Sequence, residues 1–378
     1  MRGLGRYSIT GLYLMAFAAC LFLAAVGFLS FEFWLFMRTP GSSIRGTRRV
    51  EIQAGTGALS IAQLLHNEGV ISDSRQFYLL CSLRKAGSKL KAGEYAFLPL
   101  STPDEVLDRI VNGRVILHRV TVPEGSTVRD VAKILSQNGL ASEQAIMRLA
   151  RDTSYVGTLE LSVPSLEGYL FPETYNLRKS QDERSVLKAM VRQFRLHYPE
   201  AWQKRSEELG LSVHDVVTIA SLVEKEAVVD SERPLIAAVF MNRLERNMPL
   251  QSDPTTVYDL PGFSGPITWN ELRRNSPYNT YLHTGLPAGP ICNPGARSLE
   301  AVLYHADVPY LYFVSNNDGT HHFSESYEEH RQAVSRYRKM RGASSAEGDR
   351  SSPDEAAPRA GSGEQGSERD APLPGGRE

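Results

Sequence analysis

Two segments of the chain, VEIQAGTGALSIAQLLHNEGVIS (residues 50–72) and VTVPEGSTVRDVAKILSQNGLAS (residues 120–142), repeat one another without gaps. In each copy a stretch of strand-like alternation is followed by a glycine turn and then by apolar residues at helical spacing. Gly139 follows the apolar run of the second copy, where it fits a helix C-cap. Each copy is therefore predicted to form a strand–turn–helix unit.

The residues around the two copies are predicted to complete a small α+β module over 45–150. A helical stretch is expected over 74–84, a strand over 91–97 and a helix over 104–111. A strand, an acidic or glycine turn and a helix of this kind resemble the LysM module, which binds N-acetylated glycans of cell walls. A structural spacer without a glycan site is an equally open interpretation.

The N-terminal part of the chain reads GLYLMAFAACLFLAAVGFL over 11–29 and carries no charge. About 20 apolar residues are enough to cross a bilayer. Bulky residues continue to Phe36 without a small-residue cleavage site, which favours an uncleaved transmembrane anchor over 9–36 rather than a signal peptide. Two arginines within residues 1–8 predict a cytoplasmic N-terminus, with the body on the far side of the inner membrane. Four arginines after the span argue against this orientation, but a long downstream region is translocated largely regardless of its charge.

The C-terminal segment 342–378 is predicted to be a disordered acidic tail. Its one large aliphatic residue is Leu373, so it cannot bury enough apolar surface to fold. Four Arg against three Asp and five Glu give this tail a net charge of −4.

Overall composition excludes several classes of protein. The 42 Lys and Arg nearly balance 43 Asp and Glu, so no basic excess points to nucleic acid. Three cysteines, Cys20, Cys81 and Cys292, are too few for a disulfide scaffold and too far apart for a metal ribbon. We expect Cys81 and Cys292 to be free thiols.

A larger α+β domain is expected over 151–341, and its helix over 211–227 contains the string IASLVEKEA. On a helical wheel Glu224 falls inside the apolar stripe, whereas Glu226 falls at its far edge. A carboxylate in an apolar face is costly unless it is paired, protonated or lining a cleft. Such burial raises the pKa of a carboxyl group, as a general acid at neutral pH requires. The alternative is a buried structural salt bridge from Glu224 to Arg233 or Arg243.

Two loop-like strings offer groups suited to a sugar ligand. In LQSDPTTVYDL, residues 250–260, Asp253 precedes a helix-breaking proline, and short polar side chains suit hydroxyl and amide groups. The long string NSPYNTYLHTGLPAGPICNPG over 275–295 is unlikely to serve only as a connector, and Tyr278 could stack on a sugar or pack internally. Turn chemistry without any ligand is the alternative for both strings.

Other catalytic classes lack their sequence signatures. Adjacent His321 and His322 suggest a metal, but no H-E-x-x-H spacing or cysteine pair accompanies them, so we expect no metal site. His322 is instead expected to orient or bind the substrate. The chain has no G-x-S-x-G elbow and no phosphate-binding G-x-x-x-x-G-K-[ST] loop.

Taken together, these strings resemble the YceG-like family, the MltG endolytic murein transglycosylases, over nearly the whole chain. The strings that carry the resemblance are LEGYLFPETY (166–175), ASLVEKE (220–226), FMNRL (240–244), LQSDPT (250–255), NSPYNTY (275–281), GLP (285–287), NPG (293–295) and HHF (321–323).

The resemblance implies cleavage of the bond between N-acetylmuramic acid and N-acetylglucosamine in nascent peptidoglycan, leaving 1,6-anhydro ends and ending glycan elongation. It implies one catalytic glutamate, Glu224, with Glu226 and Glu173 as the alternatives. This residue would protonate the leaving oxygen and then accept the proton of the substrate's own C6 hydroxyl. No cofactor is implied. The substrate-binding residues expected from these strings are Glu167, Glu173, Gln251, Ser252, Asp253, Asn275, Tyr278, Asn279, Thr280, Asn293 and His322.

Expected partners are peptidoglycan glycan strands, membrane lipid around the N-terminal helix, and peptidoglycan synthases or the division machinery. A membrane-tethered scaffold that binds peptidoglycan without turnover is the second hypothesis. A third is an aminodeoxychorismate lyase, which would need pyridoxal phosphate, but no strand-borne lysine with a phosphate cradle stands out.

Overall fold

The computed structural model describes residues 9–41, 46–179 and 181–336. The predicted cytoplasmic segment 1–8 and the predicted disordered tail 342–378 lie outside these residues. The helices are α1 (Ile9–Arg38), α2 (Ala58–Asn67), α3 (Ser74–Leu83), α4 (Pro103–Asn112), α5 (Val128–Gln137), α6 (Glu143–Leu149), α7 (Thr153–Thr158), α8 (Glu183–His197), α9 (Glu200–Glu208), α10 (Val213–Glu226), α11 (Arg233–Glu245), α12 (Trp269–Leu272) and α13 (Ala296–Leu303).

Strands are short and form three antiparallel pairs, β1–β2, β3–β4 and β5–β6. They are β1 (Arg48–Ile52), β2 (Gly93–Phe97), β3 (His118–Thr121), β4 (Thr174–Leu177), β5 (Tyr312–Ser315) and β6 (His321–Ser324), and the 3-10 turns are η1 (Asp230–Glu232) and η2 (Asp253–Thr256). Helices dominate the larger body, and the predicted α+β class is confirmed.

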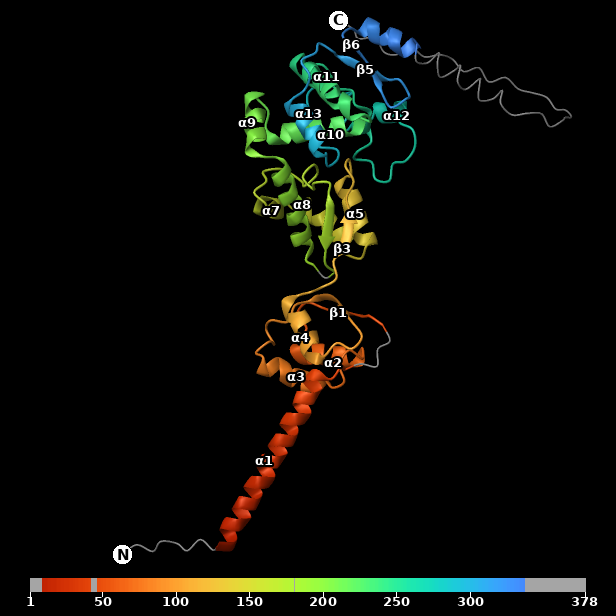
Figure 1. Ribbon diagram of the computed structural model, residues 1–378. Helices are drawn as coiled ribbons and strands as arrows, with labels where there is room; N and C mark the ends of the chain where they lie inside the picture. The colour runs from red at the N-terminus through yellow and green to blue at the C-terminus, as the bar shows by residue number, and fades with distance from the viewer. Residues whose placement is uncertain (1–8, 42–45, 180, 337–378) are drawn as a thin grey trace, which may run out of the picture.

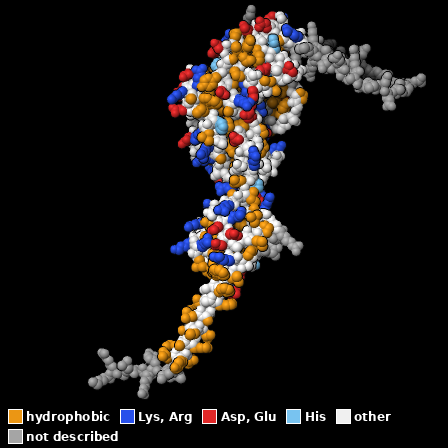
Figure 2. All heavy atoms as spheres, in the orientation of Figure 1, with side chains coloured by type: hydrophobic (Ala, Val, Ile, Leu, Met, Phe, Trp, Pro, Cys, Tyr) orange, Lys and Arg blue, Asp and Glu red, His pale blue; other side chains and the backbone are white. Residues whose placement is uncertain are grey.

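Helix α1 projects from the rest of the protein as a single rod (Figure 1). Its residues 11–38 are long and apolar enough to cross a membrane, and that span is not buried against the rest of the protein. Apolar side chains cover the length of this rod (Figure 2). At its C-terminal end Phe36 is only 7% exposed and belongs to the core of the first module, with Phe33 and Met37 packed against that core. The helix is therefore compatible with a single membrane anchor that continues directly into the folded body.

The first module has the order β1–α2–α3–β2–α4 around its own core. Strands β1 and β2 pair with Val50 opposite Tyr95, and both side chains are buried. Helix α3 begins where the Asp73 side chain accepts hydrogen bonds from the N–H groups of residues 75 and 76. Helix α4, predicted over 104–111, begins with a capping box at Thr102 and ends at Gly113 in the left-handed conformation. The core of this module consists of residues between 36 and 110.

The second copy of the repeat follows the same path through β3, α5, α6 and β4. Equivalent glycines adopt equivalent conformations: φ is +82° at Gly55 and +73° at Gly125, and +70° at Gly69 and +64° at Gly139. Apolar side chains at matching positions of the two copies are buried in both. The repeat is therefore present in the structure as well as in the sequence.

The two copies belong to different cores, whereas the sequence pattern predicted a single module ending at 150. Residues from Val120 onward pack in the larger core, which extends to Leu303. The physical reason is strand pairing, because β3 takes its partner strand β4 from beyond residue 150, with Val120 opposite Tyr175. The change of core falls between residues 110 and 120.

A cluster around Glu94 connects the first module to the larger body. The Glu94 carboxylate lies 2.7 Å from Nε2 of His118 and 3.4 Å from Nζ of Lys179. Burial alone would raise the pKa of Glu94, but these hydrogen bonds and charges outweigh it and lower the pKa. The backbone N–H of Ile116 also donates to the Glu94 carbonyl at 2.7 Å.

In the larger body α10, α11 and α13 pack on one another at the top of the molecule, above the layer formed by α5, α8 and the β3–β4 pair (Figure 1). Gly168 lies where these layers meet, with φ at +88°. A Cβ at this position would lie 2.6 Å from a methyl of Val217 and 2.7 Å from the Pro290 ring. Only glycine fits this approach without displacing core atoms.

Candidate active site

Helix α10 carries the string IASLVEKEA and ends inside it. The helix begins with a capping box between Ser212 and Asp215, and it ends at Glu226. Its residues 216–223 are all buried, so the helix is a central element of the larger core. Glu224 and Glu226 thus lie in the last helical turn, where the chain leaves the core.

Both carboxylate oxygens of Glu224 are engaged by neighbouring elements. Oε1 accepts a hydrogen bond from the Arg233 guanidinium at 3.1 Å, and Oε2 accepts one from the Gly295 N–H at 2.9 Å. The side chains of Glu224 and Arg233 are 6% and 8% exposed. Gly295 is the N-cap of α13, and Arg233 also donates to Ser298 on the same helix. Glu224 therefore joins α10, α11 and α13 through a buried salt bridge, which was the alternative interpretation of its place in the apolar stripe.

Glu226 lies in a different environment. Burial raises its pKa, the nearby Asp253 carboxylate raises it further, and a hydrogen bond from Ser252 and the positive field of His321 only partly offset this. Ser252 Oγ donates to Glu226 Oε1 at 2.6 Å. Among the described residues Glu226 forms no salt bridge. The surroundings of Glu226 therefore favour its protonated form.

The loop that carries Ser252 is held in place by buried hydrogen bonds. Ser252 N–H donates to Thr280 Oγ1 at 3.0 Å, and Thr255 Oγ1 lies 2.9 Å from the same hydroxyl. The amide of Asn279 donates to two backbone carbonyls of the same region at 2.8 and 3.0 Å. The predicted site residues Ser252, Asn279 and Thr280 are almost completely buried. They shape the loops, and only Ser252 reaches Glu226.

Exposed groups beside this loop face the solvent. Asp253 is exposed and accepts a hydrogen bond from the Tyr281 hydroxyl. Gln251 is exposed, with φ at +51°, and its side-chain oxygen accepts from Arg243 at 3.4 Å. Gln251 and Asp253 come from the string 250–260, Tyr281 comes from the string 275–295, and Glu226 comes from IASLVEKEA, so three strings that the sequence singled out meet here.

The remaining predicted residues are dispersed. Asn293 is fully buried and ties the larger body together, because it accepts from Leu170 N–H and donates to the Ser126 carbonyl. Glu173, Asn275 and His322 are exposed. Within the described part of the chain, the one side-chain hydrogen bond of these three residues is accepted by Glu173 from the next backbone N–H.

The histidine that is engaged near the site is His321 rather than His322. Its Nδ1 lies 2.7 Å from a Glu232 oxygen, and its backbone N–H donates to the other oxygen at 2.9 Å. Adjacency alone does not indicate which of two histidines in a strand points inward, so the sequence offered no means of choosing. Among the described residues no group of three or more His, Cys, Asp or Glu side chains could hold a metal ion.

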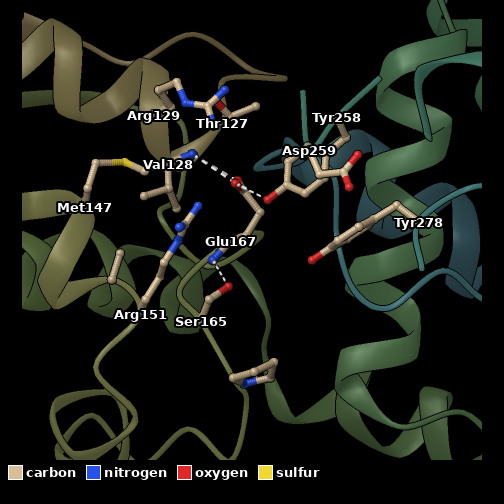
Figure 3. Close-up of a pocket in the computed structure, with 12 residues that line it drawn as sticks. Thr127, Val128, Arg129, Met147, Arg151, Ser165, Glu167, Tyr258, Asp259 and Tyr278 are labelled. Carbon is tan, nitrogen blue, oxygen red and sulfur yellow. Dashed lines mark hydrogen bonds between the residues drawn. The ribbon is translucent and has the colours of Figure 1, made fainter. Parts of the chain in front are cut away.

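A pocket of about 450 Å³ opens beside these loops. Glu167 lies in its centre (Figure 3), where it accepts hydrogen bonds from Val128 N–H at 3.0 Å and from the Tyr258 hydroxyl at 2.7 Å. Burial raises the pKa of Glu167 to about 7 despite these two hydrogen bonds. Tyr278 packs against Tyr258 with ring centroids 4.7 Å apart. Glu167 and Tyr278 were both predicted as site residues, and the structure brings them into one pocket.

Two basic residues of this pocket, Arg129 and Arg151, were not predicted. Figure 3 shows them on the wall formed by α5 and the end of α6, facing Tyr258, Asp259 and Tyr278 on the opposite wall. Arg129 lies in the second copy of the repeat but in none of the site strings, and Arg151 lies in no quoted string. Only the tertiary structure therefore associates the two arginines with the site residues. Tyr258, by contrast, lies within the string 250–260 and could have been identified there.

Comparisons with known proteins agree with this architecture. The profile of the YceG-like family matches residues 50–336. A relative from Bacillus subtilis (strain 168), named endolytic murein transglycosylase, is 31% identical over 307 residues, which cover 77% of this chain and 85% of the relative. A relative of the same name from Streptococcus pneumoniae (strain ATCC BAA-255 / R6) is 28% identical over 353 residues, covering 83% of this chain and 63% of the relative.

A solved structure gives the same result. The crystal structure of a YceG-like protein from Listeria monocytogenes superposes with a TM-score of 0.53 at 31% sequence identity, covering 76% of this chain and 99% of that chain. The chain therefore belongs to the YceG-like family.

Proposed function

We propose that this protein is an endolytic murein transglycosylase. It cleaves the bond between N-acetylmuramic acid and N-acetylglucosamine in nascent peptidoglycan strands, leaves 1,6-anhydro ends and so terminates elongation. The observation that carries the proposal is the similarity, over most of the chain, to relatives that bear this name. It is supported by a partly buried carboxyl group with a raised pKa at the end of α10, beside loops rich in sugar-compatible groups.

The reaction requires one acid/base group, because the substrate's C6 hydroxyl is itself the nucleophile. We assign this role to Glu226 in place of Glu224. Both oxygens of Glu224 already accept hydrogen bonds, one of them from Arg233, so the side chain is engaged within the protein. Glu226 has no salt-bridge partner among the described residues, and burial raises its pKa, which is the direction that a general acid requires.

The proton transfer follows from this environment. Protonated Glu226 donates to the glycosidic oxygen as the C1–O bond breaks, and the resulting carboxylate takes the proton of the C6 hydroxyl as C6–O attacks C1. The Ser252 hydroxyl donates to Oε1, so it holds the carboxyl in one orientation and leaves Oε2 for the proton. Holding the nucleophile within the same sugar raises its effective concentration.

We further propose that α1 anchors the protein in the cytoplasmic membrane with the N-terminus inside and the catalytic body outside. The first module, with its strand–helix–helix–strand order, is assigned a LysM-like role next to the membrane. Glycan strands are the substrate, and peptidoglycan synthases or division proteins would be neighbours of the same membrane.

The test is digestion of purified cell wall by the full-length protein in detergent micelles, with mass spectrometry of the released fragments. Anhydro-ended fragments are expected from the wild type and none from Glu226→Gln. Glu300→Gln is the matched control, because Glu300 is exposed on α13 and forms no side-chain hydrogen bond among the described residues. Reducing-end fragments would contradict the lytic mechanism. Glycan binding without any fragment would identify a scaffold instead.

A further inference from the structure

The pocket beside the active-site loops has an uneven distribution of paired and unpaired charge. Its acidic groups are already satisfied within the protein. Asp259 is paired with Arg274 and accepts from Ser276 at 2.9 Å. Glu167 accepts hydrogen bonds from Val128 N–H and from the Tyr258 hydroxyl. Because burial raises its pKa to about 7, it carries only part of a negative charge near neutrality.

The basic groups of the pocket have no such partners. Neither Arg129 nor Arg151 forms a side-chain hydrogen bond or salt bridge with any residue that the structure describes. Arg151 is exposed and Arg129 is partly exposed at the rim, and both line the same hollow (Figure 3). A guanidinium group presents a planar set of donors that matches a carboxylate or phosphate. The two guanidinium groups without protein partners are therefore suited to bind an anion in this pocket.

The pocket also adjoins the proposed reaction site through shared elements. Tyr258 and Tyr278 line the pocket, and the same two strings supply Ser252 and Tyr281 beside Glu226. Lys225, the neighbour of Glu226, donates to the Gly125 carbonyl at 2.7 Å, three residues before Val128 of the pocket wall. The pocket and the proposed reaction site are therefore built in part from the same two strings, 250–260 and 275–295.

The backbone of a glycan strand is neutral, whereas the peptide on its muramic acid bears carboxylates. We propose that the Arg129–Arg151 pocket binds a carboxylate of this stem peptide and so makes the enzyme prefer peptide-bearing strands. The inference rests on the proposed function, since it takes the substrate to be peptidoglycan. About 450 Å³ is in the size range of pockets that hold small ligands. Met147 and the two tyrosine rings give the rest of the peptide apolar contact.

Direct binding tests the pocket separately from catalysis. Full-length Glu226→Gln protein in micelles is titrated with a muramyl peptide, with the same peptide amidated at its carboxylates, and with inorganic phosphate. Binding of the free-acid peptide is expected, and the amidated peptide should bind more weakly. Adding Arg129→Gln and Arg151→Gln together should weaken the affinity for the free-acid peptide by roughly tenfold or more, as expected for the loss of charged hydrogen bonds. Arg119→Gln, an exposed arginine on β3 without a side-chain partner among the described residues, is the matched control.

A second readout uses turnover by protein with Glu226 intact. The ratio of KM on strands stripped of peptides to KM on intact strands should exceed one for the wild type and approach one for the double arginine variant. Unchanged peptide affinity in the double variant would overturn the proposal, as would binding of phosphate but not peptide. If no glycan is cleaved but peptide binding still depends on the arginines, the proposed function fails and the pocket assignment stands. If glycan is cleaved but peptide binding does not depend on the arginines, the pocket assignment fails and the proposed function stands.

Discussion

Exchanging each of the two glutamates of α10 for glutamine should separate a structural role from a chemical one. Glu224→Gln removes the charge that faces Arg233 within a pair whose side chains are 6% and 8% exposed. Breaking a buried ion pair from one side costs about 3–5 kcal/mol. Glutamine still accepts from Gly295 N–H, and Asp230 still pairs with Arg233 at 3.0 Å, so we expect about 2–3 kcal/mol here. For a body of this size that corresponds to a fall of roughly 4–12 °C in the unfolding midpoint.

Glu226→Gln should have the opposite profile. The pKa of Glu226 is raised in the folded state. Ionisation of Glu226 therefore lowers the stability of the fold as pH rises through its folded-state pKa, and this loss of stability is absent below its unfolded-state pKa. An uncharged glutamine should therefore leave the midpoint unchanged or raise it at pH 7. Activity should fall by about 10²–10⁴-fold, the usual contribution of a general acid or base.

The assay combines thermal unfolding with release of anhydro-ended fragments, both on the full-length protein in micelles. Turnover is measured at a temperature well below every unfolding midpoint, so that unfolding cannot be mistaken for a loss of catalytic activity. Glu224→Gln should retain measurable turnover, and Glu300→Gln should match the wild type in both measurements. A stable, inactive Glu224→Gln together with an active Glu226→Gln would refute the assignment.

Three further outcomes follow from the packing described above. Gly168→Ala should lower the free energy of unfolding by about 3 kcal/mol or more, because it adds both backbone strain and a clash in the core. Gly210 also has a positive φ but has open space around it, so Gly210→Ala should lower that free energy by about 1 kcal/mol. Denaturant unfolding measures both variants, and equal effects would contradict the clash. Glu94→Gln should speed proteolysis between the two cores. Because the pKa of Glu94 is lowered, the wild type should hold its resistance at neutral pH and lose it as pH falls through the folded value; a pH-independent rate would argue against the link. Burial raises the pKa of Cys81 to about 11 and that of Cys292 well above its usual value. Neither thiol should therefore react with iodoacetamide at pH 8 until the protein unfolds. Labelling of either cysteine in the native protein would count against its burial.

Features that depend on local pattern were accessible from the sequence. The repeat, the helix predicted over 104–111 and the free thiols Cys81 and Cys292 are all confirmed. The repeat could be read because its glycines at 55, 69, 125 and 139 each serve one local backbone conformation. Periodicity also placed the string IASLVEKEA on a helix, and that helix is α10, although its residues 216–223 are all buried rather than one face alone.

Features that depend on distant contacts were not accessible. The sequence could not reveal that β3 pairs with β4 rather than with a strand of the first module, because pairing is decided by the tertiary fold. A helical wheel correctly placed Glu224 in the apolar stripe, but it carries no information on what lies opposite. The structure places Arg233 and the N-terminus of α13 there. Neither Arg129, which lies in the second copy of the repeat, nor Arg151 belongs to a string that suggested a site, and only folding brings them to the pocket.

The insertion of Phe36 into the core of the first module has a mechanical consequence. The 30 residues of α1 extend about 45 Å, whereas the hydrocarbon layer of a bilayer is about 30 Å thick. A helix crossing it would emerge unbroken and enter the module without a hinge, because Phe33, Phe36 and Met37 pack against the module's own side chains. The first module would then be held at a fixed distance from the lipid. Any change in the position or tilt of the larger body relative to the membrane would have to come from the connection at the Glu94 cluster, farther along the chain. The distance from the membrane at which glycan is cleaved would thus depend on how α1 packs into the first module, and a point substitution at Phe36 could alter it.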